Sequence, residues 1–254
     1  MNLKQEKNFM IIDSHIHIGK WSEVFFNYTS TVEQAIYVMK SSGVDAAVCM
    51  PTDSTSNLEL FAQTIDNRDF KFYYMAWINP MDPELDKFLE NNINRISLFK
   101  IHPSLQKRRI TDPSFVKYLA LAESRRIPVV VHCGRWQEIA SYKFCLEVSV
   151  MFPGIPLILA HMGGDQPGLI MECAIEIARN RYNNVYLGTE SVREFYFVNN
   201  AVKIVGADKV IFGSDYNLGL PSMYIPLIES LDIPATDKEQ IFSGNILRLI
   251  SNRS

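Results

Sequence analysis

The sequence contains no apolar run of about 18 residues, the length that a helix needs to cross a bilayer. Its first nine residues, MNLKQEKNF, are mostly polar and charged, so they lack the apolar centre of a secretory signal peptide. We therefore expect a cytoplasmic protein without a membrane partner.

Cysteine and excess positive charge are also scarce. The four cysteines lie in apolar surroundings and form no C-x-x-C pair, which predicts buried, reduced thiols rather than a disulfide framework. Lys and Arg number 25 against 28 Asp and Glu, and the formal net charge is −3. A nucleic-acid partner needs clustered Lys and Arg, and the only dense basic run, QKRR at 106–109, is short. We expect no nucleic-acid partner.

Apolar residues are plentiful, at 47% of 254 residues, and they occur in short runs that alternate with longer amphipathic segments. Continuous Val, Ile and Leu runs are typical of strands that are buried on both faces of a parallel sheet. Several of the amphipathic segments open with Asp-Pro or Thr, which are helix start signals. The predicted strands are 9–13, 44–50, 71–78, 96–101, 127–132, 155–161, 184–189 and 209–215.

Eight strand–helix units in about 250 residues predict an α/β fold, a single (β/α)8 TIM barrel that forms one domain over residues 1–254. A doubly wound open sheet is the alternative. That fold more often has a Gly-rich loop after its first strand, where this chain has His-Ile-His. Residues 236–251 predict one further helix that completes the outer ring.

All five histidines lie at or just past the end of a predicted strand. They are His15, His17, His102, His132 and His161, and Asp215 ends the eighth strand. The carboxyl ends of the strands of a parallel barrel meet at one mouth, so these side chains are expected to converge there. Imidazoles with one carboxylate suit Zn²⁺ and related ions. The pattern predicts a catalytic metal site that activates water, with an Asp and a remaining His to move protons.

Six motifs in order along the chain carry a resemblance to a known family. They are IIDSHIHIG, FKIHP, IPVVVHCG, LILAHMGG, IFGSDYN and IFSGNILRLI. The chain resembles the amidohydrolase superfamily, and within it the amidohydrolase 2 group, which includes aminocarboxymuconate semialdehyde decarboxylase and lactone hydrolases. The resemblance implies that His15, His17, His132 and Asp215 bind the metal. It also implies that Asp215 and His161 are catalytic, with His161 orienting or activating the water or ligating a second ion.

The number of ions depends on Lys100. Binuclear members of the superfamily carry a carboxylated lysine on the strand that Lys100 occupies, whereas the K-I-H-P context looks more like the mononuclear group, in which the lysine lines the barrel. We expect one divalent ion per chain, zinc first and manganese as the alternative, and two ions if Lys100 is carboxylated.

Further residues at the predicted mouth are candidates for substrate contact. Arg135 offers paired donors for a carboxylate and Trp136 a ring for stacking, unless both belong to an ordinary exposed loop. His102 either contacts substrate or fixes the loop before Pro103. The other candidates are Lys100, Glu190, Tyr216 and Asn217.

The function expected from these features is a metal-dependent hydrolase acting on a small, carboxylate-bearing lactone, amide or ester. A non-oxidative decarboxylase with the same residues is the nearest alternative. A catalytically silent metal-binding barrel is disfavoured by the presence of Asp215 and His161, and a TatD-like nuclease by the absence of a glutamate on the fourth strand. The aromatic segment 20–31 is expected to cap the site or to form the interface of a homodimer.

Overall fold

The computed structural model describes residues 9–252. Its strands form one sheet in the order β2-β1-β3-β4-β5-β6-β7-β8-β9. β1 and β2 are antiparallel, and every other neighbouring pair is parallel. The strands are β1 (Ile12–Lys20), β2 (Thr29–Ser30), β3 (Ala46–Pro51), β4 (Lys71–Trp77), β5 (Ile96–Ile101), β6 (Val129–Val131), β7 (Leu157–Leu159), β8 (Val185–Gly188) and β9 (Val210–Ile211).

The sheet closes because the chain that follows β9 runs alongside β1. The Ser14 amide donates to the Phe212 carbonyl at 3.0 Å, and the Asp215 amide donates to the His15 carbonyl at 3.0 Å. Ile16 forms a parallel bridge with Tyr216. β1 and β3–β9 are therefore the eight parallel strands of a TIM barrel, as the sequence predicted, and β2 is an addition to its rim.

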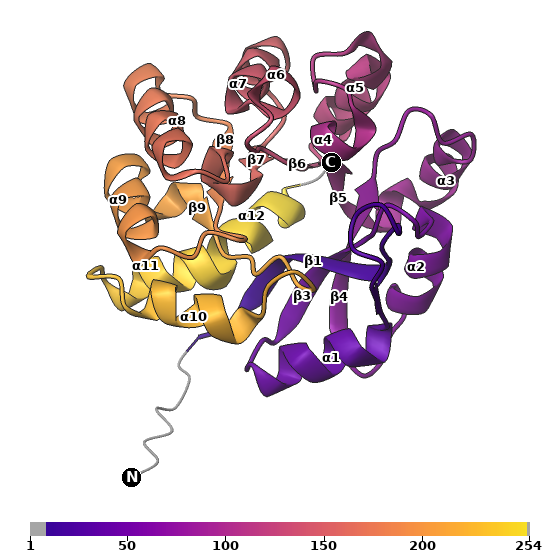
Figure 1. Ribbon diagram of the computed structural model, residues 1–254, viewed down its shortest axis with the longest axis horizontal. Coiled ribbons are helices and arrows are strands. Elements are labelled where there is room, and N and C mark those ends of the chain that lie inside the picture. The colour runs from indigo at the N-terminus through magenta and orange to yellow at the C-terminus, as the bar shows by residue number, and fades with distance from the viewer. Residues whose placement is uncertain (1–8, 253–254) are drawn as a thin grey trace.

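Helices surround the strands as an outer ring (Figure 1). The α-helices are α1 (Val32–Ser41), α2 (Asn57–Thr64), α3 (Leu85–Asn92), α4 (Pro103–Gln106), α5 (Val116–Arg125), α6 (Gln137–Ala140), α7 (Tyr142–Met151), α8 (Pro167–Asn180), α9 (Phe195–Val205), α10 (Pro221–Glu229), α11 (Ala235–Glu239) and α12 (Asn245–Ser251). Short 3₁₀ segments are η1 (Ile93–Arg95), η2 (Pro113–Phe115), η3 (Ala160–Gly163) and η4 (Ala207–Lys209), and η5 (Gln240–Gly244) is a π-helix. Within residues 9–252, no helix combines the length and apolar character needed to cross a membrane.

Side chains alternate between the two faces of each strand, so the buried residues form two clusters, one outside the barrel wall and one inside it. In β6, Val129 and Val131 pack with helix residues outside the barrel, whereas Val130 belongs to the cluster inside it. In β5, Leu98 is an interior residue, and because side chains of a strand alternate, Lys100 also points into the barrel. This register places a lysine, rather than another leucine, beneath the mouth.

The first strand is longer than predicted. The sequence suggested an end at residue 13, but β1 continues to Lys20, so His15 and His17 lie within it and not beyond it. The extension is stabilised by pairing with β3 and with β2, which the sequence did not predict. Polar residues are tolerated there because they face the site at the mouth.

The predicted helix over 236–251 is interrupted. It comprises α11, η5 and α12, and the interruption has a hydrogen-bonding cause. The Ile241 carbonyl accepts from the Phe212 amide at 3.0 Å, which diverts it from the helical ladder to the barrel wall. The wider π turn accommodates this tertiary contact.

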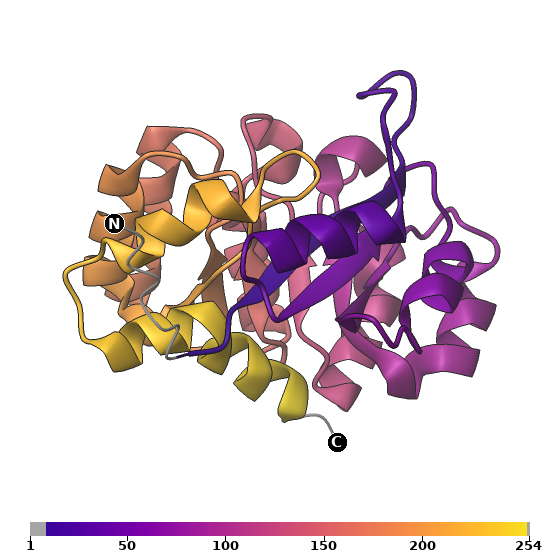
Figure 2. The same cartoon turned by 90° about the horizontal axis from the view of Figure 1, so that it is seen from below.

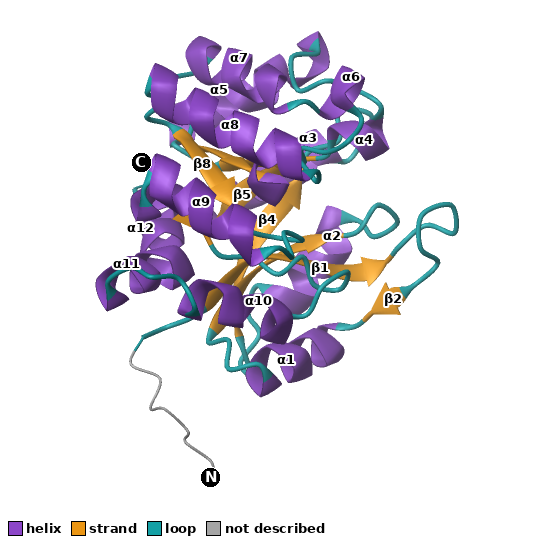
Figure 3. Ribbon diagram, turned by 60° about the vertical axis from the view of Figure 1, so that its left-hand side comes forward, coloured by secondary structure: helices purple, strands orange, loops and turns teal. Residues whose placement is uncertain are grey.

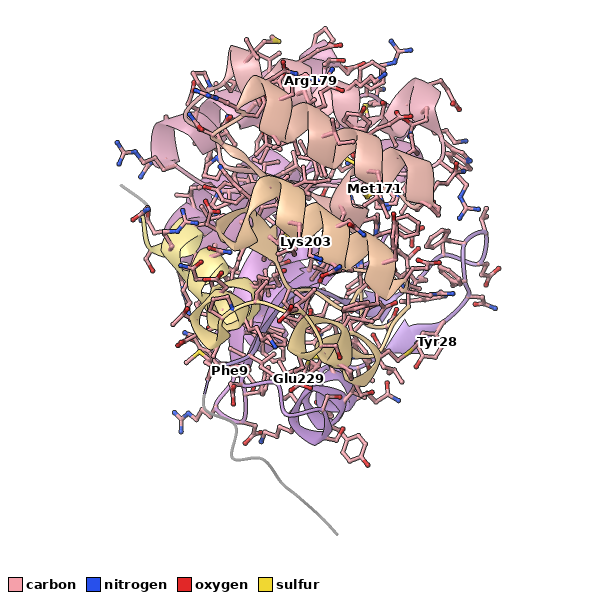
Figure 4. The ribbon with its side chains drawn as sticks, turned by 90° about the vertical axis from the view of Figure 1, so that its left-hand side faces the viewer. Phe9, Tyr28, Met171, Arg179, Lys203 and Glu229 are labelled. Atoms are coloured by element: carbon pink, nitrogen blue, oxygen red, sulfur yellow. The ribbon has the colours of Figure 1, made fainter. Side chains whose placement is uncertain are left out.

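The segment between β1 and β2 projects from the barrel, as Figures 2 and 3 show. Its tip is apolar and exposed: Val24 is 98% exposed and Phe26 51%. Figure 4 shows Tyr28 at the side of the molecule where this segment emerges, away from Lys203 and Arg179 on the outer helices. We call residues 21–28 the projecting segment.

Candidate metal centre

Eight buried or half-buried polar residues gather where the parallel strands end. β1 carries His15 and His17, and β5 carries Lys100. The remaining five follow the ends of successive strands, and they are His102 (after β5), His132 (after β6), His161 (in η3), Glu190 (after β8) and Asp215 (after β9).

His15, His17 and Asp215 form a compact donor group. One ligand atom from each lies within 4.8 Å of the others, and all three residues are buried. The Asp215 Oδ1 atom lies 3.6 Å from His15 Nε2 and 3.5 Å from His17 Nε2. Ligands bound at about 2.1 Å to a tetrahedral zinc ion are about 3.4 Å apart, so these separations suit a shared cation.

In His15 and His17, the contacts of the ring nitrogens determine whether Nε2 is free to bind an ion. His17 Nδ1 faces the Pro51 carbonyl at 3.4 Å, and His15 Nδ1 lies 2.9 Å from Glu190 Oε1. A carbonyl only accepts, so Nδ1 of His17 carries the proton and its Nε2 keeps a lone pair toward Asp215. In His15, the Lys100 ammonium only donates and lies 3.2 Å from Nε2, so this nitrogen also keeps its lone pair. Burial holds the pKa of His15 well below its usual range, which keeps this imidazole neutral. Such a carboxylate–histidine contact is common behind metal ligands.

Asp215 is held as a carboxylate. Its Oδ2 accepts a hydrogen bond from Ser191 Oγ at 2.6 Å, leaving Oδ1 for the imidazoles. Burial alone would raise the pKa of Asp215, but its interactions with the neighbouring His17, His15 and His161 outweigh that effect and hold the pKa well below its usual range. Asp215 therefore presents a negative charge to the donor group at neutral pH.

Three residues of the site have left-handed backbone conformations, which are uncommon for residues with side chains. The φ angles are 57° at His161, 58° at Ser191 and 62° at Asp215. Such conformations cost on the order of 1–3 kcal/mol each and persist where the surrounding structure enforces them. Here they aim three polar side chains at the mouth of the barrel.

Lys100 and Glu190 place opposite charges beneath the donor group. Lys100 Nζ lies 3.2 Å from His15 Nε2, and burial lowers the pKa of Lys100 to about 8. Burial also raises the pKa of Glu190 to about 7. Within the described residues, neither oxygen of Glu190 has an aligned hydrogen bond, despite the close approach of His15. This carboxyl has room because a Cβ at Gly188 would approach Glu190 Oε2 to 2.3 Å.

His132 and His161 form a second pair beside the donor group. His161 Nε2 lies 3.0 Å from His132 Nδ1, and His161 Nδ1 lies 3.0 Å from the Glu190 carbonyl. A Cβ at Gly134 would lie 2.9 Å from His132 Nε2, so this glycine leaves space at that nitrogen. Among the described residues, His132 stands outside the three-residue donor group. Its role as a ligand, and that of His161 as the group that orients water, stay predictions.

These features fit a divalent cation. The donors are neutral imidazole nitrogens and a carboxylate, the set that zinc and its neighbours prefer. Near the same mouth, the buried Glu190 carboxyl has no aligned hydrogen bond within residues 9–252, and Gly134 leaves a space that a Cβ would fill.

The predicted substrate residues lie in different surroundings. The Arg135 side chain is 67% exposed and its Nε donates to Asp165 at 2.9 Å, and Trp136 is 51% exposed. Both sit on the outer rim. His102 is buried and caps α4, accepting from the Leu105 amide at 3.3 Å, so the loop-fixing contact that we considered is present. Whether any of these residues contacts substrate stays a prediction.

The sequence candidates beyond β9 have structural partners. The Asn217 side chain accepts from Trp21 Nε1 at 2.8 Å and donates to Ser30 Oγ at 2.7 Å, which ties the projecting segment to the barrel. Tyr216 is buried. These contacts stabilise the mouth from its edge.

Three residues of the site were missed by sequence reasoning. Ser191 fixes Asp215, and Trp21 packs on the His17 ring with centroids 4.8 Å apart. Trp77 stacks on the His102 ring at 5.5 Å. All three stand at or after a strand end, so the rule that singled out the histidines would also have reached them.

Comparisons with known proteins identify a matching family and several similar solved structures. The model of the family described as amidohydrolase matches residues 12–251. Curated proteins gave no match. Similar solved structures include 5-carboxyvanillate decarboxylase LigW from Sphingomonas paucimobilis, with 15% identity, a TM-score of 0.74, and coverage of 96% of this chain and 99% of that one.

Two further structures are known with metals. An amidohydrolase from Burkholderia multivorans with bound zinc has 13% identity and a TM-score of 0.75, covering 95% of this chain and 99% of that one. A dihydroxybenzoic acid decarboxylase from Polaromonas sp. JS666 with bound manganese has 13% identity and a TM-score of 0.74, covering 97% and 98%. At these identities the likeness concerns the fold.

Proposed function

Because this chain belongs to the amidohydrolase family, we propose that it is a metal-dependent hydrolase of a small lactone, amide or ester that carries a carboxylate. The observation that carries the proposal is the buried donor group of His15, His17 and Asp215. A divalent ion held there would supply Lewis-acid chemistry, lowering the pKa of a water molecule to about 7 and polarising the substrate carbonyl.

Metal binding, proton transfer and orientation of the water are assigned to individual side chains. His15 and His17 hold the ion through Nε2, and His132 supplies a fourth donor. Asp215, fixed by Ser191, accepts the proton of the attacking water through Oδ1 and returns it to the leaving group. His161, anchored on the Glu190 carbonyl, orients that water.

We propose one zinc ion per chain, with manganese as the alternative. A site with several imidazoles and one carboxylate supports zinc, and similar barrels are known with zinc and with manganese. A second ion would require carboxylation of Lys100, whose Nζ already faces His15 Nε2.

The carboxylate of the substrate is assigned to Arg135. Its Nε is engaged by Asp165, which leaves the two terminal nitrogens as a fork for a carboxylate. The exposed Trp136 ring offers a stacking surface on the same loop.

A non-oxidative decarboxylase is the second candidate, because similar structures that match almost the whole chain are named as decarboxylases. In that reaction a C–C bond breaks, CO₂ leaves, and a proton returns to the carbon atom. Asp215 or His161 would supply that proton from the same positions.

Turnover in ¹⁸O-labelled water separates the two reactions. The metal-loaded protein is given a panel of lactones, amides, esters and unsaturated acids, each with a carboxylate. Hydrolysis places one ¹⁸O atom in the organic product and releases no CO₂, whereas decarboxylation releases CO₂ and leaves the organic product unlabelled. A protein that binds metal tightly and turns over none of the panel would support the silent metal-binding barrel instead.

We also propose an oligomeric state and a cellular location. The exposed apolar tip of the projecting segment supports a homodimer, and a cytoplasmic location agrees with four buried, free cysteines.

A further inference from the structure

Three aromatic rings form a stack at one side of the mouth. The rings of Trp77 and His102 have centroids 5.5 Å apart at an interplanar angle of 16°. The rings of His102 and His132 are closer, at 3.9 Å and 11°. Trp77 and His102 are buried, at 8% and 7% exposure, so His102 is a fixed layer between a tryptophan and the more accessible His132.

The ring of His102, in the middle of the stack, is held in place by a hydrogen bond at its edge. His102 is the N-cap of α4, and its Nδ1 accepts a hydrogen bond from the Leu105 amide at 3.3 Å. Its backbone amide donates to Gln106 Oε1 at 3.1 Å. The ring therefore cannot turn without loss of the cap, and its flat face is a fixed surface for His132.

The hydrogen bonds of the neighbouring pair define the tautomer of His132. The Glu190 carbonyl only accepts, so His161 Nδ1 carries the proton that it donates at 3.0 Å. In the neutral imidazole, Nε2 of His161 is then an acceptor, and His132 Nδ1–H donates to it at 3.0 Å. The lone pair of His132 is left on Nε2, beside the space at Gly134.

Two contacts are needed to keep that arrangement. A 180° flip of the His132 ring keeps the ring plane and breaks the bond to His161, whereas a quarter turn breaks the stack as well. The hydrogen bond with His161 thus determines which edge of the His132 ring faces His161, and the stack on His102 determines the plane of the His132 ring.

We propose that His102 is a positioning residue, which through its stack on His132 holds the Nδ1–H of that ring on His161 and so leaves the lone pair of Nε2 free as the fourth donor of the proposed metal centre. The inference rests on the proposed function, because the orientation of His132 matters for catalysis only if this residue binds a metal ion. The orientation itself is a property of the metal-free protein.

Two substitutions separate the stack from the helix cap. His102→Phe keeps a flat ring and removes the cap acceptor, whereas His102→Asn keeps a cap acceptor and removes the ring. If His102 positions His132, the Phe variant preserves the tautomer and the Asn variant does not. A residue that served only as a cap would give the opposite order.

The tautomer is measured directly by two-bond ¹H–¹⁵N correlation spectra. The chain has five histidines, so labelling histidine alone gives few signals, and a His132→Gln variant identifies that of His132. Spectra of the metal-free protein and Zn²⁺ titrations against a chromophoric chelator are recorded for the wild type and both His102 variants. Thermal melts verify that each variant is folded.

We expect the Nδ1–H form of His132 in the wild type and in His102→Phe. In His102→Asn we expect loss of that form and a 10- to 100-fold weaker Zn²⁺ affinity, the usual effect of removing a support behind a ligand. An Nε2–H form in the wild type would overturn the proposal without any variant. So would a His102→Asn protein that keeps both tautomer and affinity.

If His102→Asn does not fold, His102→Ser is a second variant that keeps a cap acceptor and removes the ring. Disorder of the His132 tautomer in that variant supports the proposal, and an unchanged tautomer overturns it. A wild type that binds no metal would refute the proposed function, while the tautomer spectra would still decide the role of His102.

Discussion

Replacing Asp215 by asparagine tests the centre of the proposed mechanism. The backbone φ at this position is 62°, and asparagine tolerates the left-handed region better than alanine does. The substitution therefore changes charge and basicity with little effect on the fold, whereas Asp215→Ala would add backbone strain.

The expected loss follows from the contacts of the two carboxylate oxygens. If the new amide oxygen stays on Ser191, the NH₂ group faces the Nε2 atoms of His15 and His17, which lie 3.6 and 3.5 Å from Oδ1. If the amide is flipped, a neutral oxygen faces them. In both orientations the negative charge and the proton acceptor are lost, so kcat should fall by at least about 10²-fold, or roughly 2.7 kcal/mol in the barrier.

The assay compares kcat and bound metal in the wild type, Asp215→Asn and Ser191→Gly, with thermal melts as the check on folding. Ser191→Gly is the matched control, because it removes the hydrogen bond to Oδ2, keeps the charge and tolerates the φ of 58° at this position. It should retain metal and lose less activity than Asp215→Asn. An Asp215→Asn enzyme of ordinary activity would remove Asp215 from the mechanism and refute the reasoning.

Four other outcomes are expected. Treatment with a chelator should abolish turnover, and elemental analysis should find about one zinc or manganese ion per active chain; two would indicate a carboxylated Lys100. Arg135→Lys should raise KM for an acidic substrate several-fold, since an ammonium cannot reproduce the fork, and an unchanged KM would return Arg135 to the solvent-exposed loop. Phe26→Ser, at the exposed tip of the projecting segment, should shift a dimer toward monomer in light scattering, and a monomeric wild type would contradict the proposed interface. Cys49 should resist a maleimide at pH 8 until the protein is denatured, because burial raises the pKa of its thiol to about 12; rapid labelling of the native protein would show that the thiol is accessible.

The sequence by itself determined that the chain folds as a barrel and that the candidate site lies at the carboxyl ends of its strands. Runs such as Val129–Val131 have no polar alternation, and only strands buried on both faces need such runs. Parallel strands end at one mouth whatever their exact lengths, so the positions of His15, His17 and Asp215 along the chain were sufficient to predict that they converge.

Tertiary structure decided which of these residues meet. Closure of the barrel brings Phe212 to Ser14, 198 residues earlier, and this pairing sets Asp215 against His15 and His17. Local sequence carries no information about that register. The same closure diverts the Ile241 carbonyl and produces the π turn that periodicity could not predict.

Side-chain orientation was equally beyond the sequence. Which nitrogen of an imidazole is free depends on the acceptor behind it, such as the Pro51 carbonyl for His17, and that acceptor comes from another strand. The engagement of Arg135 by Asp165 and the stack of His102 on His132 also join separate loops. Residue type and strand ends predict the members of a site, whereas distances and tautomers arise from packing between elements that are remote in the chain.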